Sequence, residues 1–163
     1  MKRLVVGIGM SAALTAAAAA QMPNYGVRVS IDKQVDFAAF KTYSWTPGQP
    51  SADKMVDAGV IAAVDRELSA LGMSKATSGP DVLATYYSLS RTDVNLKAKP
   101  DSEGRLPQYW VGTLVVALLD PGSRERLLRL RIDKPIEIEP AKLQVTIDSA
   151  VAALFAKYPT RRK

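Results

Sequence analysis

The sequence predicts an α+β domain in which two helices pack on one face of an antiparallel sheet of about five strands, in the order ββαβββα. Two β-branched and leucine-rich runs, 110–119 and 127–132, flank a turn that contains Pro and Gly, which is typical of a β-hairpin. Segments 53–71 and 140–158 instead repeat their apolar residues at helical intervals. Packing both helices on one face of the sheet is the natural arrangement for this order of elements.

The first third of the chain predicts two strands. Residues 27–31 alternate between apolar and polar side chains, as a half-buried strand does. Residues 42–45 are rich in β-forming residues and are soon followed by a Pro-Gly pair, which predicts the second strand. Between the two strands, Asp36 is positioned to cap a short turn of helix over residues 36–40.

The two predicted helices have clear ends. In the first, 53–71, the apolar residues form one stripe, and Gly72 follows as the left-handed residue that ends the helix. The second, 140–158, begins at Pro140, which suits a first helical position, and stops before Pro159. The stripe of the first helix consists of Ile61, Val64, Leu68 and Leu71, and that of the second of Leu143, Ile147, Val151, Leu154 and Tyr158.

Three more strands are predicted between the helices. Residues 81–91 form a long strand, and residues 95–108 form a polar loop with little to bury. The run 110–119 is apolar on both alternating faces, which indicates a covered central strand. The run 127–132 alternates, and we expect it to continue through residues 133–139 with a bend.

The N-terminal segment predicts export. Residues 1–20 combine a charged start, an apolar centre too short for a comfortable membrane span, and small residues before Gln21, as in a cleavable secretory signal peptide. We therefore expect a soluble periplasmic protein without a transmembrane span. Its single α+β domain would cover residues 25–158, followed by a short basic tail, 159–163. Because no cysteine follows the signal, we expect no lipid anchor.

The composition of the chain limits the kinds of catalytic and metal-binding sites that it can form. The chain has no Cys and no His, which excludes disulfides, thiolate nucleophiles, cysteine metal sites and the commonest general base. No nucleophile elbow, phosphate loop or zinc motif is present. The sequence therefore predicts no catalytic, cofactor-binding or metal-binding residues. The net charge of +6 is dispersed, apart from a run of arginines from 124 to 131 and the basic tail, so it is weak evidence for a nucleic-acid or membrane partner.

Carboxylate pairs keep a hydrolase open as an alternative. Asp81 and Asp93 bracket a predicted strand, and Glu137 and Glu139 would share one face of another strand if it is regular. Two carboxyl groups can hydrolyse a glycoside when their separation and pKa values suit it. The commoner role for such acids is to cap turns and to face solvent.

Aromatic residues in the predicted strands do not predict a nucleic-acid site. An RNA-binding sheet stacks bases on strand aromatics. Tyr86 and Tyr87 are adjacent, so they point to opposite faces and at most one of them can join such a platform. Export removes the usual partner as well. We therefore predict packing roles for these side chains.

The candidate partner-binding face consists of Arg129 and Arg131. Alternation along their strand puts both side chains on one face, directed at water, with Arg124 and Arg126 near the turn. Such a face suits an anionic surface or an acidic envelope protein. A solvated sheet face is the simpler explanation of the same pattern. Replacing Arg129 and Arg131 by Gln is expected to weaken envelope association without unfolding the domain.

Four patches of the chain stand out: Val35–Trp45, Pro80–Tyr87, Gly112–Val116 and Leu154–Pro159. In this order they resemble the bacterial envelope family catalogued as domain of unknown function 4136. The resemblance implies an exported protein of Gram-negative bacteria with no assigned activity, and it supplies no catalytic residues. This chain lacks the lipidation cysteine of many relatives. It also has Leu127-Leu128-Arg129 where relatives often have Trp.

Together these features predict an exported, non-enzymatic binding or accessory module of the Gram-negative cell envelope, working through a sheet surface or the loop 95–108. The alternatives are a periplasmic hydrolase that uses paired carboxylates, and a purely structural assembly component. The sequence carries no signal for an oligomeric state.

Overall fold

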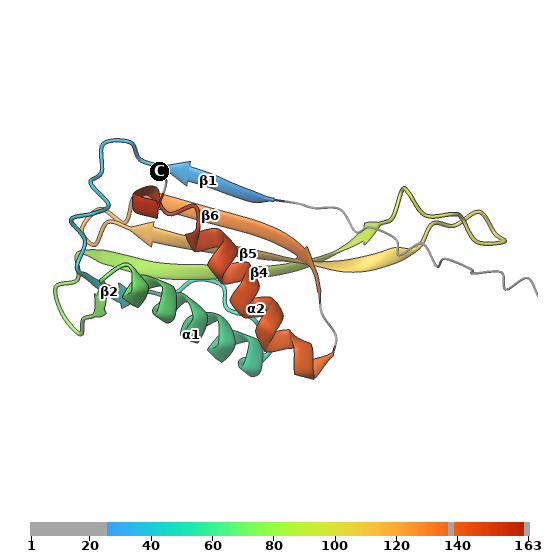
Figure 1. Cartoon of the computed structure of the whole chain (residues 1–163), viewed down its shortest axis with the longest axis horizontal. Helices are drawn as coiled ribbons and strands as arrows, with labels where there is room; N and C mark the ends of the chain where they lie inside the picture. The colour runs from blue at the N-terminus through green and yellow to red at the C-terminus, as the bar shows by residue number, and fades with distance from the viewer. Residues whose placement is uncertain (1–25, 137–138, 162–163) are drawn as a thin grey trace, which may run out of the picture.

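A mixed six-stranded sheet forms the body of the protein, and two helices lie side by side on one of its faces (Figure 1). The computed structural model describes residues 26–136 and 139–161. The predicted signal peptide, residues 1–20, lies outside the described residues, as do Glu137 and the last two residues of the predicted basic tail. The elements are β1 (Val27–Ile31), β2 (Thr42–Trp45), α1 (Lys54–Ala70), β3 (Ser74–Lys75), β4 (Val82–Val94), β5 (Gln108–Leu119), β6 (Arg126–Pro135), α2 (Pro140–Phe155) and the 3₁₀-helix η1 (Pro159–Arg161).

The strand order is β1-β6-β5-β4-β2-β3. Strands β1, β6, β5 and β4 pair with one another in antiparallel fashion, but β2 is parallel to both β4 and β3. The prediction of an α+β fold with two helices is confirmed, but the sheet is mixed and has six strands, whereas an antiparallel sheet of about five strands was predicted. Helix α1 is the reason, because it carries the chain back along the sheet and the next strands then run in the same direction as β2. The sixth strand, β3, has two residues, which is too short for an alternating pattern.

Residues close to the helix ends in the sequence determine where the two helices begin and end. The Asp53 side chain accepts hydrogen bonds from the backbone N–H groups of Met55 and Val56 and so caps α1. Gly72, with a φ of 84°, follows the end of α1 as predicted. Helix α2 stops at Phe155, three residues earlier than expected, and Tyr158 turns back into the core.

The predicted short helix over residues 36–40 is absent, and the described chain makes turns there instead. Asp36 still acts as a cap, because its Oδ1 accepts a hydrogen bond from the Ala38 N–H at 3.0 Å. Phe37 is buried next to Tyr158, with their rings edge to face. Aromatic packing of this turn against the end of the chain thus replaces helical hydrogen bonding.

The main core lies between the helices and the sheet. Alternate residues of the four long strands point to this side, and the registers align them in rows such as Val29, Leu130 and Val116. Each row meets apolar side chains of α1 and α2, among them Val64 and Val151, which are fully buried. The helix stripes predicted from the sequence therefore do face the sheet.

Strands β4 and β5 continue past the helices as a two-stranded arm, and residues 95–107 form its tip (Figure 1). The arm is paired through Val94 and Gln108, and the Asn95 N–H donates to the Pro107 carbonyl at its base. It presents apolar side chains to solvent, because Leu96 is 81% and Trp110 59% exposed. The prediction of a covered central strand over 110–119 therefore holds for most of β5 but not for its first residues.

Candidate functional site

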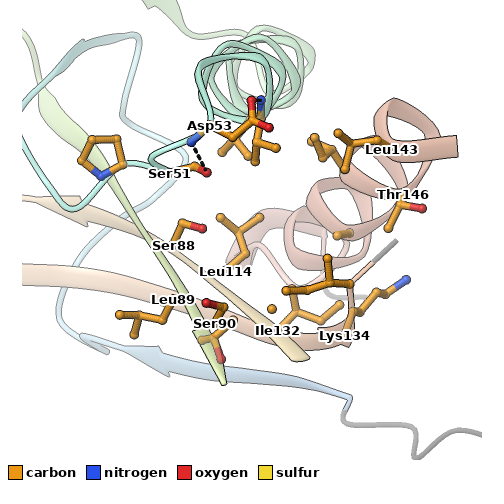
Figure 2. A pocket seen from close by; sticks show the side chains of 18 of the residues that line it. Ser51, Asp53, Ser88, Leu89, Ser90, Leu114, Ile132, Lys134, Leu143 and Thr146 are labelled. Carbon is orange, nitrogen blue, oxygen red and sulfur yellow. Dashed lines mark hydrogen bonds between the residues drawn. The ribbon is translucent and has the colours of Figure 1, made fainter. Parts of the chain in front are cut away.

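An open cleft of about 680 Å³ lies where the first turns of both helices stand over the sheet. Its floor is the helix-side face of β4, β5 and β6, and one wall comes from each helix (Figure 2). Its volume is in the range of small-molecule binding pockets. The apolar lining side chains that carry the argument below are Val56, Leu114, Ile132, Ile136, Leu143 and Ile147.

Two glycines allow the chain to shape the cleft. Gly48 passes β4 so closely that a Cβ there would lie 2.2 Å from the carbonyl oxygen of Tyr86. This close approach places the residues after Gly48 along the edge of the cleft. Gly59 lies where α1 meets α2, and a Cβ would lie 2.8 Å from the Gln144 Oε1 and 3.2 Å from the Ile147 Cδ1. A side chain at either position would push the wall out of place.

Hydrogen bonds hold α1 over the sheet at its cleft end. The Tyr86 hydroxyl donates to Asp57 of α1 and accepts from the Ser51 N–H at 3.1 Å. Burial of Tyr86 and the hydrogen bond to Asp57 raise the pKa of its hydroxyl to about 12. The hydroxyl therefore stays protonated and remains a donor throughout the physiological range.

A second set of hydrogen bonds fixes the other half of α1. Asp65 accepts from the Tyr43 hydroxyl at 2.7 Å, from the Trp45 Nε1 at 2.8 Å and from the Lys75 ammonium at 3.1 Å. Burial, followed by the contact with Asp65, raises the pKa of Tyr43. The wall formed by α1 is thus anchored by side chains from three strands, β2, β3 and β4.

The polar groups of the cleft do not form a catalytic set. Ser88, Ser90 and Thr146 contribute hydroxyl groups to the lining. The carboxylate that lines it, Asp53, accepts hydrogen bonds from the first turn of α1. Lys134 supplies the cation, and no described acid pairs with it. The described residues also contain no group of three or more acidic side chains that could hold a metal ion.

The structure does not bring Asp81 and Asp93 together, and the second predicted pair cannot be compared because Glu137 lies outside the described residues. Asp81 precedes β4 and Asp93 lies near its far end, so the two are roughly 40 Å apart along an extended strand. Asp81 instead accepts from the N–H groups of Lys41 and Thr42, both at 2.8 Å, and these bonds hold its pKa below the ordinary value. Glu139 pairs with Lys142 at 2.7 Å.

Arg129 and Arg131 do share one face of β6, on the side of the sheet without helices. Arg131 is not free, however, because its guanidinium contacts the carboxylate of Asp133 at 3.1 Å, and that carboxylate is only 4% exposed. Thr113 also donates to Asp133 at 2.5 Å, and Arg91 lies 3.6 Å from it. This network explains why an acid can be buried on an open face.

Burial of the Asp133 carboxyl is the largest single influence on its pKa and opposes ionisation. The hydrogen bonds from Thr113 and Arg131, together with the charges of Arg131 and Arg91, outweigh burial and hold the pKa below the ordinary value. Asp133 is a structural acid that the sequence pattern did not single out. Its place in the alternating strand, two residues after Arg131 and on the same face, was the available signal.

Arg28 is the residue that the sequence prediction of this face missed. The register pairs Arg28 of β1 with Arg131 and Ser30 with Arg129. The alternation within 27–31 already put Arg28 on a polar face, but only the pairing of β1 with β6 brings it to the same face as Arg129. We call Arg28, Arg129 and Arg131 the arginine face.

No helix in the described part of the chain is long and apolar enough to span a membrane. No functionally curated protein matches the sequence. Among solved structures, the fold is similar to a PDZ domain protein from Parabacteroides distasonis, with a TM-score of 0.62 and 14% identity over 84% of this chain. The similar region is 36% of that protein, so this chain spans about a third of its length.

The fold is also similar to PelC from Paraburkholderia phytofirmans, which was crystallised as a dodecamer, with a TM-score of 0.53 and 10% identity. This likeness covers 80% of the present chain and 94% of PelC. At these identities the two structures establish a shared fold. The sequence itself matches one family model, described as domain of unknown function DUF4136, over residues 27–160. The chain therefore belongs to the DUF4136 family.

Proposed function

We propose that the protein is an exported, non-enzymatic binding or accessory module of the Gram-negative cell envelope, and that it holds an apolar ligand in the cleft. The cleft carries the proposal, because it combines a volume of about 680 Å³ with an apolar floor and walls. Burying apolar ligand surface there is favourable by about 25 cal/mol for each Å² removed from water. The features of a cleavable signal before Gln21 support export.

The anchoring of α1 supports a preformed site. Asp57 and Asp65 tie α1 to strands β2, β3 and β4 through hydrogen bonds to four side chains. A wall held in this way needs little ordering when a ligand enters, so less of the binding free energy is lost.

The test is binding of N-phenyl-1-naphthylamine, a neutral apolar dye, followed by its fluorescence. Thr146→Phe places a ring in the cleft and is expected to weaken binding at least tenfold. Val145→Phe is the matched control, because the neighbouring Val145 is 69% exposed and does not line the cleft. Failure of the unmodified protein to bind the dye, or equal binding by both variants, would reject the proposal.

A structural component of an assembly is the second candidate. Leu96 and Trp110 expose apolar surface on the arm, and a second copy of the chain is a suitable partner for it. The likeness to PelC, crystallised as a dodecamer, adds support. Sedimentation analysis of the protein and of a Leu96→Ser, Trp110→Ser variant tests this candidate. A monomeric protein at high concentration would exclude it.

We also propose that the arginine face contacts an anionic surface. Arg28 and Arg129 have no described acid paired with them, so their charges are available. The hydrolase alternative is weaker, since Asp81 is engaged by backbone N–H groups and Glu139 by Lys142.

A further inference from the structure

The floor of the cleft restricts what can lie on it. Strand β5 is hydrogen-bonded to β4 on one side and to β6 on the other, so the backbone groups beneath the cleft already have partners. A peptide lying across this face would bring N–H and C=O groups that find no backbone partners there and lose their bonds to water. An acyl chain brings no polar groups. The apolar walls formed by Val56, Leu143 and Ile147 therefore fit a hydrocarbon chain better than a polypeptide.

One cation, Lys134, lies at this floor. Lys134 is half-buried and stands opposite Gly112 in the register of β5 and β6, on the side of the sheet that bears the cleft. Figure 2 draws it reaching beyond Ile132, with its ammonium at the periphery of the apolar side chains. No described acid pairs with it, whereas the nearby Lys142 is held by Glu139 at 2.7 Å. The Asp53 carboxylate is directed to the first turn of α1 instead.

The ligand class follows from these two features. We propose that the cleft binds a long-chain fatty acid, with its hydrocarbon chain against the apolar walls and its carboxylate on Lys134. A single ammonium group matches a single negative charge, and a charged head group at the rim stays partly hydrated while the chain is buried. This inference rests on the proposed function and adds the chemical class of the ligand.

The experiment displaces bound N-phenyl-1-naphthylamine with four ligands that share a dodecyl chain: dodecanoate, dodecanol, dodecyl phosphate and dodecyltrimethylammonium. We expect dodecanoate to bind about fivefold more tightly than dodecanol and more tightly than the cation, because an exposed ion pair contributes an effect of this size. Octanoate should bind much more weakly than dodecanoate, since each buried methylene raises affinity up to about fourfold.

Lys134→Gln should abolish the preference for dodecanoate over dodecanol and leave dodecanol binding unchanged. Lys142→Gln, the matched control, removes the same charge from a lysine that does not line the cleft and should keep the preference. Thermal unfolding of both variants verifies that they fold.

The outcomes separate the two proposals. Equal affinity for dodecanoate and dodecanol, a stronger preference for dodecyl phosphate, or an unchanged preference in Lys134→Gln would overturn the fatty-acid assignment while the apolar cleft remains. If the dye binds but none of the four ligands displaces it, the fatty-acid assignment fails alone. If the dye itself does not bind, the proposed function fails as well.

Discussion

The two faces of the sheet bury their apolar residues in different ways. On one face, α1 and α2 cover the strands with whole helices, and Leu130 is fully buried there. The other face has no helix, yet Val115 and Ala117 are only 5% and 4% exposed. The register places them directly opposite Arg131 and Arg129 on the neighbouring strand. Arginine can cover apolar surface with its stem while its charge stays in water.

An arginine in an alternating strand can therefore have two roles at once. On the open face these side chains shield the sheet, and the guanidinium of Arg131 also neutralises the buried Asp133. The helix side, on which the cleft lies, is covered by α1 and α2 and needs no such arginines. We therefore expect function at the cleft on one face and, on the other, at Arg28 and Arg129, which have no acid partner among the described residues.

The largest effect is expected when the polar network of the open face is broken. Asp133→Ala removes the acceptor of Thr113 and the partner of Arg131 and should lower the free energy of unfolding by about 3 kcal/mol. Urea denaturation measures the change. Asp148→Ala is the control, because its pair with Arg66 is exposed and should contribute under about 1 kcal/mol. Similar losses in both variants would show that the network is not what stabilises the open face.

A second measurement compares the two faces directly. Val115 and Val116 are neighbours in β5 that point to opposite faces, and both are buried. Val116→Ala leaves a cavity between rigid helices and should cost about 2.5 kcal/mol. Val115→Ala should cost about 1 kcal/mol, because flexible arginine stems can move into the space. Urea denaturation of the pair is the test, and a larger loss for Val115→Ala would contradict our account of the open face.

Much of this fold was predictable because it depends on local pattern. Apolar spacing located both helices, and alternation, β-forming residues or apolar runs located the five longer strands. The parallel pairing of β2 with β4 and the short strand β3 were not predictable, since both depend on where α1 returns the chain. The turn at residues 36–40 was mistaken for a helix because Asp36 caps both structures with the same hydrogen bond.

The candidate sites could be predicted from the sequence less completely than the fold. The cleft is made by side chains from five separate helices and strands, so no local sequence motif predicts it. Arg129 and Arg131 were found by alternation, but Arg28 requires the β1–β6 register and the engagement of Arg131 requires the buried Asp133. The substitution first suggested by the sequence, of Arg129 and Arg131 together, would therefore disturb the fold as well as the surface.

Acid should weaken the open face selectively. The folded state holds the pKa of Asp133 below its ordinary value, so between these two values the unfolded chain binds a proton that the native protein does not. The stability that Asp133 contributes is fully present above about pH 4 and is lost as the pH falls through the folded pKa. Urea unfolding from pH 5 to pH 2 should show the unmodified protein losing more stability than Asp133→Asn. Parallel curves would mean that Asp133 is not linked to acid unfolding.

The smallest change in stability is expected for the arginines that have no acid partner. Arg28→Gln with Arg129→Gln should alter the free energy of unfolding by less than about 0.5 kcal/mol, and the relief of Arg28 from the opposite Arg131 should offset lost packing. The same variant should bind vesicles of phosphatidylglycerol several-fold more weakly in a sedimentation assay at low salt. Arg66→Gln with Arg105→Gln is the control of equal charge, since these residues lie on α1 and on the arm. If both double variants lose binding equally, net charge governs the association and the arginine face has no special role. If only the first loses it, the open face of the sheet has a function that its partner, the helix-covered face, does not share.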